Sequence, residues 1–281
     1  MATLETQALV LRVVAFGESD RIAHLLTPAT SRLTVIAKGA RRSRRRFPGT
    51  LDLFNLLAVR VERRRTTSLA RLEQARLVDA FPALRVEPAR FALACYLVEL
   101  LDRLAPEGAG GRDARELFAV ALSALGAVAR RPADARLRAL LELRLLAALG
   151  LRPELARCVR CGRTLAAATG SDGSVAFDVG EGGPHCGACA RGGDAGLPLH
   201  LGTLRALDQG LRLPVDRLER LALSPQALRE SELLLGRFLR FHAGVELRSE
   251  RFLASVLAQA PGGRAQRGEA ERSSSGRAAA Q

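Results

Sequence analysis

Four cysteines near the middle of the chain constrain its fold more than any other feature. They form two Cys-x-x-Cys pairs, Cys158 with Cys161 and Cys186 with Cys189, and 24 residues separate the pairs. Each pair can direct two sulfur atoms at one ion, and structural Zn²⁺ is typically held by four thiolates at about 2.3 Å. The sequence therefore predicts a structural zinc module in which the two pairs meet around one Zn²⁺.

Other chemistry at these cysteines is less well supported. His185 precedes Cys186 and could replace one sulfur ligand, although four thiolates already complete a closed site. Zinc deaminases carry a similar Pro-Cys-x-x-Cys segment, but they also need a His-x-Glu sequence, and this chain has none. Two pairs in one short segment favour metal binding over redox chemistry. The fifth cysteine, Cys95, lies in an apolar run and is expected in the core.

Positive charge is concentrated in the N-terminal part of the chain. The formal net charge is +14, and residues 1–85 hold 16 Lys or Arg against 7 Asp or Glu. Clustered cations of this kind can follow a phosphate backbone. We therefore expect a nucleic-acid-binding surface made of Lys38, Arg41, Arg42, Arg44, Arg45, Arg46, Arg63, Arg64 and Arg65. The alternative interpretation is a solvated basic loop that binds nothing.

Aromatic side chains are scarce in the same region. Residues 1–85 contain only Phe16, Phe47, Phe54 and Phe81, and neither Tyr nor Trp. Proteins that grip single strands through their bases commonly use exposed aromatic side chains. Binding is therefore expected to be driven by the phosphate backbone, neutral to sequence and strongly dependent on salt.

The N-terminal 80 residues have the pattern of a small β-barrel. Five β-rich or alternating runs are separated by turn residues, at 9–14, 21–27, 32–37, 53–61 and 69–75. Among small barrels, the five-stranded OB-fold is the one most often used for nucleic acids. The count and spacing of the runs also fit an SH3-like barrel.

After residue 82 the apolar spacing becomes helical. Helices are expected at 91–104, 113–130, 133–149, 201–213, 225–242 and 249–258. The predicted α+β chain has an OB-fold barrel at 1–80, a helical domain at 81–157 and 193–260, an inserted four-cysteine zinc module at 158–192 and a disordered tail at 261–281. The first residues lack the features of a secretory signal, and no run of about 18 uncharged apolar residues occurs. We expect a cytoplasmic protein with no membrane partner.

Several segments resemble a known family, that of the bacterial recombination mediator RecO. In the predicted barrel these are Gln7–Arg12, Gly17–Ile22 and Ala37–Arg42, and around the zinc module and the last helix they are Leu149–Gly162 and Leu247–Leu253. The similarity covers about residues 5–255, and the segments occur in the same order. In the turn after the second strand, where the family often has glycine, this chain has Pro28–Arg32 instead.

The resemblance implies an OB-fold followed by a helical domain with a zinc module. It also implies binding to single- and double-stranded DNA, annealing of complementary strands, partnership with RecR and the single-strand DNA-binding protein, and help in loading RecA. Lys38, Arg41 and Arg42 match the family's basic turn, whereas the other arginines of the surface are assigned on charge alone.

The function expected from the sequence is therefore that of a DNA-repair and recombination mediator, bacterial, cytoplasmic and associated with the nucleoid, and not an enzyme. The main alternative is a zinc-stabilised adaptor that binds RNA in transcription or translation. A zinc-dependent hydrolase or deaminase is a more distant one.

Overall fold

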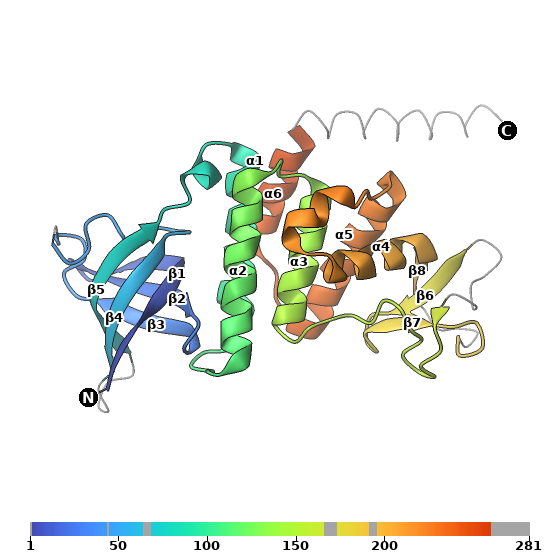
Figure 1. Ribbon diagram of the computed structural model, residues 1–281, viewed down its shortest axis with the longest axis horizontal. Coiled ribbons are helices and arrows are strands. Elements are labelled where there is room, and N and C mark those ends of the chain that lie inside the picture. Colours follow the sequence, from blue (N-terminus) through green and yellow to red (C-terminus); the bar gives the residue numbers. More distant parts are fainter. Residues whose placement is uncertain (1, 44, 64–68, 166–172, 191–195, 260–281) are drawn as a thin grey trace. The chain divides into compact units, whose positions relative to one another are not determined.

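A computed structural model describes residues 2–43, 45–63, 69–165, 173–190 and 196–259 (Figure 1). The N-terminal part is a five-stranded sheet that closes on itself as a barrel, in the order β1-β2-β3-β5-β4. The strands are β1 (Ala2–Phe16), β2 (Asp20–Thr27), β3 (Ser31–Ala37), β4 (Leu56–Arg63) and β5 (Ala70–Asp79). All pairings are antiparallel except that of β3 with β5, which joins Val35 to Ala70 and Ile36 to Arg71. The five predicted strands are thus confirmed.

Alternating apolar residues build the barrel because successive side chains of a strand point to opposite faces. The inward side chains, contributed by every strand, include Ala8, Val10, Ala23, Leu25, Leu33, Val35, Leu57, Val59, Val61 and Leu72. Strand β1 is longer than predicted. Its first half pairs with β4 and its second half with β2, and a register shift lies between Val10 and Arg12. One long strand shared by two partners is what closes the sheet.

The turn between β2 and β3 contains no glycine and holds a strained serine. Ser31 has a φ of 51°, in the left-handed region that glycine adopts most easily. The adjacent Arg32 is held on both sides of its backbone, because its N–H donates to Pro106 O and its carbonyl accepts from Gly108 N. These neighbours keep the turn in place without a glycine.

Two helices, α1 (Pro88–Leu104) and α2 (Arg112–Arg130), follow a short 3₁₀ turn, η1 (Pro82–Arg85), and pack on the barrel and on each other. The buried Asp102 of α1 lies 2.5 Å from His24 Nδ1 of β2, and Arg32 donates to the backbone carbonyl of Asp102. Cys95 is half-buried rather than fully enclosed, and burial raises the pKa of its thiol to about 11. An inert packing role fits these surroundings.

The remaining described elements are α3 (Ala135–Ala148), a small sheet in the order β7-β6-β8, three further α-helices and one 3₁₀ helix. The sheet comprises β6 (Ser174–Asp178), β7 (Gly183–His185) and β8 (Leu197–His200), and α4 (Leu201–Arg212), η3 (Val215–Arg220), α5 (Pro225–Ala243) and α6 (Arg248–Gln259) follow. Buried Arg138 of α3 contacts Glu232 of α5 at 3.3 Å and Glu250 of α6 at 3.0 Å. This charged contact ties three helices together. All six predicted helices are present.

The chain divides into two compact units, and the boundary between them does not coincide with the change from strands to helices near residue 80. One unit comprises Met1–Arg131 with Ala148–Gly150, and the other Pro132–Ala147 with Leu151–Gln281. The first two helices belong to the barrel's unit because they pack on it. The predicted tail at 261–281 lies outside the described residues. Among those that are described, no helix combines the length and apolar character needed to cross a lipid bilayer.

Candidate functional sites: a basic loop and a cysteine cluster

The segment after β3, residues 38–43 with 45 and 46, is called the basic loop, and hydrogen bonds hold it against the turn between β1 and β2. Asp20 accepts a hydrogen bond from Gly39 N at 2.8 Å, and its other carboxylate oxygen lies 3.0 Å from Lys38 Nζ. Arg41 donates from its backbone N to Ser19 O and from its side chain to Glu18 O. The bond from Gly39 N–H and the neighbouring Lys38 ammonium hold the pKa of Asp20 below its usual value. The loop therefore leaves the barrel in a defined direction.

The predicted phosphate-binding cations differ in what they contact. Arg42 and Arg45 are exposed. Arg46 is half-buried, donates to Lys38 O at 2.8 Å and lies with its guanidinium 5.3 Å from the centre of the Phe47 ring. Arg46 thus closes the loop on itself, while Arg42 and Arg45 extend into solvent.

The second predicted cluster is described only in part. Arg63 is exposed at the end of β4, opposite Ala2 of β1. Three of the predicted site residues lie outside the described residues: Arg44, Arg64 and Arg65. The pairing of β3 with the first residues of β5 brings the end of the β4–β5 hairpin to the side of the barrel from which the basic loop leaves.

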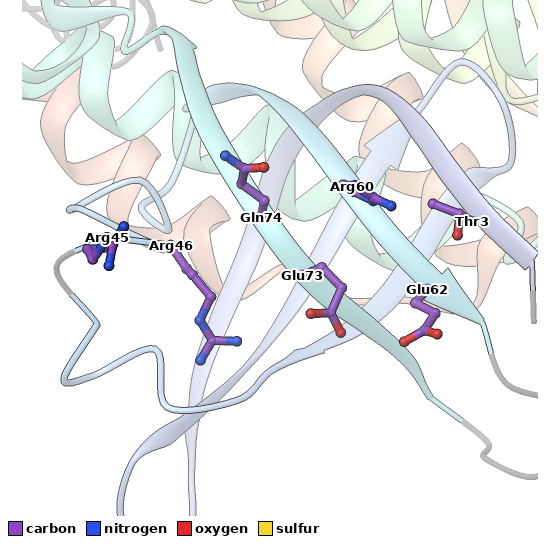
Figure 2. Close-up of a pocket in the computed structure, with 7 residues that line it drawn as sticks. All are labelled: Thr3, Arg45, Arg46, Arg60, Glu62, Glu73 and Gln74. Carbon is purple, nitrogen blue, oxygen red and sulfur yellow. The ribbon is translucent and has the colours of Figure 1, made fainter.

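A hollow of about 580 Å³ lies on the outer surface of β1, β4 and β5, beside the basic loop (Figure 2). Its lining residues are Thr3, Arg45, Arg46, Arg60, Glu62, Glu73 and Gln74. The loop reaches this surface because Ala75 N of β5 donates to Arg46 O. Arg60 was not among the predicted site residues, although its place between buried Val59 and Val61 indicates an outward side chain. The two glutamates moderate the positive charge of the hollow.

The four cysteines of the predicted zinc module are brought together. Their Sγ atoms all lie within 4.8 Å of one another, and those of Cys161 and Cys186 are 3.6 Å apart. Four sulfurs arranged tetrahedrally at about 2.3 Å from Zn²⁺ would be about 3.8 Å apart, so the donor set fits this ion. Tight turns form both knuckles: Gly162 N donates to Cys158 O and Cys189 N to Cys186 O, each at 2.8 Å.

Hydrogen bonds within the cluster lower the pKa of the Cys158 and Cys186 thiols, whereas the neighbouring Cys161 and Cys186 raise the pKa of Cys189. Burial opposes ionisation of Cys158, but hydrogen bonds from the backbone of Cys186, Cys161 and Arg160 outweigh it and lower the pKa of the thiol to about 6. Metal ligation requires the thiolate form. His185 lies outside the quartet, with its Nε2 3.2 Å from Glu181 Oε2. The alternative in which His185 replaces a cysteine is therefore not needed to complete four ligands.

Arg160 connects the two knuckles and was missed by the sequence analysis. It lies between Cys158 and Cys161, contacts Glu181 at 2.7 Å and donates to the backbone carbonyl of Cys189 at 3.0 Å. The Arg160 guanidinium, with a further contribution from His185, holds the pKa of Glu181 below its usual value. A cation at this place would offset part of the negative charge of four thiolates if they held Zn²⁺.

Comparison with known proteins identifies relatives over nearly the whole chain. Residues 1–81 match the family model described as "Recombination protein O N terminal", and residues 85–251 match "Recombination protein O C terminal". A protein named "DNA repair protein RecO" from Anaeromyxobacter dehalogenans strain 2CP-C is 41% identical over 259 residues, covering 91% of this chain and 98% of that protein. Proteins of the same name from Symbiobacterium thermophilum and Syntrophus aciditrophicus are 34% and 32% identical, each covering 91% of this chain and 98% and 96% of their own lengths.

Proposed function

Since the chain belongs to the RecO family of DNA repair proteins, we propose that it is a mediator of homologous recombination that binds single- and double-stranded DNA and anneals complementary strands. The observation that carries the DNA-binding part is the exposed basic loop held in place by Asp20. Cations fixed on a rigid scaffold lose less conformational freedom when phosphates bind than cations on a mobile segment.

The barrel is an OB-fold in this proposal. Support comes from the closed strand order β1-β2-β3-β5-β4 and from the parallel pairing of β3 with β5. OB-folds bind oligonucleotides on one sheet face and on adjoining loops. This arrangement favours the OB-fold over the SH3-like alternative that the strand count left open.

Annealing follows from charge neutralisation. Two DNA strands repel each other through their phosphates, and each phosphate neutralised by Lys or Arg releases condensed counterions. Exposed Arg41, Arg42 and Arg45 on the loop and Arg63 at the end of β4 would hold the strands close together. Base pairing then supplies the free energy of the duplex, so the protein needs no catalytic group and acts without being an enzyme.

The cysteine cluster holds a structural Zn²⁺ in this proposal. Cys158, Cys161, Cys186 and Cys189 would supply four ligands and leave no open coordination position for a substrate or water. The ion, when bound, would stabilise the small sheet β7-β6-β8 and the two knuckles. This is a folding role, not a hydrolytic one.

The partner proteins in this proposal are those that membership of the RecO family implies. We assign contacts with RecR and the single-strand DNA-binding protein, and assistance in loading RecA, to the helical regions 81–157 and 193–260, and the place of action to the bacterial cytoplasm at the nucleoid. The barrel, at 1–80, would remain available to DNA while these regions hold proteins.

The decisive experiment is annealing of complementary strands that are precoated with the cognate single-strand DNA-binding protein. The wild type should accelerate annealing, and the triple variant R41A/R42A/R45A should lose most of that acceleration. On uncoated strands, where no protein partner takes part, the control with equal charge loss is R217A/R220A/R229A, which removes three exposed arginines outside the barrel and should anneal like the wild type. Tight binding to RNA with no annealing of coated DNA would contradict the proposal and support the RNA adaptor.

A further inference from the structure

One phenylalanine of the barrel is not used in its core. Phe47 and Phe54 are 3% and 0% exposed, whereas Phe16, the last residue of β1, is 49% exposed. Phe81, beyond the barrel, is half-buried. An aromatic side chain that leaves half its surface in water at a strand end gives up much of its burial free energy.

Phe16 belongs to a larger apolar surface on the outside of the barrel. The register aligns Val14 of β1 with Ile22 of β2, and Ile22 with Ile36 of β3. The next row inward, Val13, Ala23 and Val35, faces the core. Side chains alternate between faces, so the residues Val14, Phe16, Ile22 and Ile36 lie on the outer face of the three strands, and we call them the apolar face.

The apolar face remains open at the end near the β1–β2 turn. Val14 is 42% exposed, and Ile22 and Ile36 are half-buried. Helix α1 occupies the other end of the same face, where His24 and Arg32 contact Asp102. Three strands about 4.8 Å apart give a surface about 10 Å wide, enough for a nucleic-acid base to lie flat on it.

Cations lie at both ends of the apolar face. At the turn end, Asp20 is paired with Phe16 across the strands and holds Lys38 at 3.0 Å, and exposed Arg41 is bonded to the same turn. At the other end, Arg12 lies on the same face two residues before Val14, 3.9 Å from Asp102 Oδ2 and with half of its side chain exposed. An apolar strip between cations is complementary to a strand with flat bases and a charged backbone.

We propose that the apolar face is a base-stacking platform for unpaired nucleotides, with Phe16 as the principal stacking residue and with Lys38, Arg41 and Arg12 directed at the flanking phosphates. This inference rests on the proposed function, because it assumes that the basic loop binds DNA. It adds a selectivity that charge alone does not provide. Single strands expose the faces of their bases, whereas a duplex hides them within its own stack.

The absence of tryptophan from the sequence allows a direct test. The chain has no Trp and one Tyr, so Phe16→Trp creates a single indole reporter on the apolar face. We expect its fluorescence to be strongly quenched by a thymidine oligonucleotide and only weakly by a duplex of the same length. A strand of the same length without bases should bind through its phosphates but leave the fluorescence unchanged. Equal quenching by the strand without bases would overturn the platform.

Affinity measurements separate this inference from the proposed function. Phe16→Ala should weaken binding to single-stranded DNA about tenfold, leave duplex binding unchanged and keep the salt dependence of the wild type, while Phe16→Tyr should bind like the wild type. Val86→Ala is a control because Val86 is an apolar residue, 75% exposed, outside the barrel.

Each failure has a separate meaning in this design. If the wild type binds neither form of DNA, the proposed function fails. If it binds DNA but Phe16→Ala binds both forms as the wild type does, the platform alone is wrong. Loss of a protein partner by Phe16→Ala, with unchanged DNA affinity, would also overturn the platform and make the apolar face a protein-docking surface.

Discussion

The basic loop and the cysteine cluster are both organised by one charged side chain, but of opposite sign. In the barrel, the Asp20 carboxylate fastens a turn that carries cations. In the cysteine cluster, the Arg160 guanidinium joins two turns that carry thiols. Arg41, Arg42 and Arg45 of the loop are exposed, whereas Cys158 and Cys186 are buried, Cys189 is half-buried and Cys161 is exposed. Exposed cations suit a ligand that comes and goes, and largely covered thiols suit an ion that stays.

The largest effect is expected from removing a ligand of the cysteine cluster. Cys158→Ser removes one of four ligands, so the protein should lose its zinc and its second compact unit should be destabilised by several kcal/mol, because the free energy of metal binding is also free energy of folding. Metal content and denaturant unfolding are the measurements. Cys95→Ser is the matched control, since Cys95 is half-buried and outside the cluster. Full zinc content in Cys158→Ser would disprove the assigned ligand set.

Removing exposed cations from the basic loop should weaken DNA binding and leave folding intact. If the protein contacts about six phosphates, a plot of the logarithm of its affinity for single-stranded DNA against the logarithm of salt concentration should have a slope of about −4. R41A/R42A/R45A removes three exposed cations and should make this slope shallower by about 2 and weaken binding about 10- to 100-fold at low salt. Zinc content and melting temperature should not change. An unaltered slope would exclude these arginines from phosphate contact.

A smaller effect, on zinc affinity, is expected when Arg160, the cation that joins the two knuckles, is replaced. Arg160→Ala keeps all four thiols but removes the contacts to Glu181 and Cys189 O. Changes around a metal's ligands typically cost 10- to 100-fold in metal affinity, so zinc should pass to a competing chelator about tenfold more readily. Cobalt substituted for zinc should still give a four-sulfur absorption spectrum. Arg163→Ala, an exposed arginine next to the same knuckle, should behave like the wild type.

The smallest effect is expected from neutralising Asp20, the carboxylate that holds the basic loop. The folded pKa of Asp20 is lowered, so the contribution of its carboxylate is present above the unfolded value of about 3.8 and is lost as pH falls through the folded pKa. Hydrogen exchange at Gly39 N–H should therefore be slow at pH 6 and lose its additional protection only below pH 3.8, as Asp20 becomes protonated. In Asp20→Asn this acid-dependent change should disappear. A Gly39 exchange profile identical in both proteins would mean that Asp20 does not hold the loop.

Local patterns account for much of the fold. The alternation in β2 and β3 and the apolar spacing of α1, α2 and α5 predict these elements to within a few residues. By contrast, the sequence indicates only residues 9–14 of β1. Its first half alternates weakly, and Leu4 is only partly buried against the core. Pairing with β4 makes this half a strand, and that partner lies more than 40 residues away.

The sequence predicts which cysteines come together but not which arginines face solvent. The Cys-x-x-Cys spacing identifies the four clustered thiols because each pair is a local turn. The arginine run identifies the basic loop, yet it treats all its members alike. Only the folded loop assigns Arg46 to an internal contact with Lys38 O and leaves Arg42 and Arg45 exposed. Arg160 carries no signal in the sequence, because its partners come from another segment.

The sequence by itself determined that this chain would contain a strand-rich, basic N-terminal region, a helical region and a four-cysteine module. These properties depend on composition and on spacings of a few residues, which short-range sterics and ligand geometry convert directly into structure. Only the tertiary structure decided which cations face solvent and which phenylalanine of the barrel stays outside its core. Those outcomes depend on strand register and on contacts between distant segments, such as Phe16 with Asp20 and Asp20 with Lys38, which no local pattern encodes.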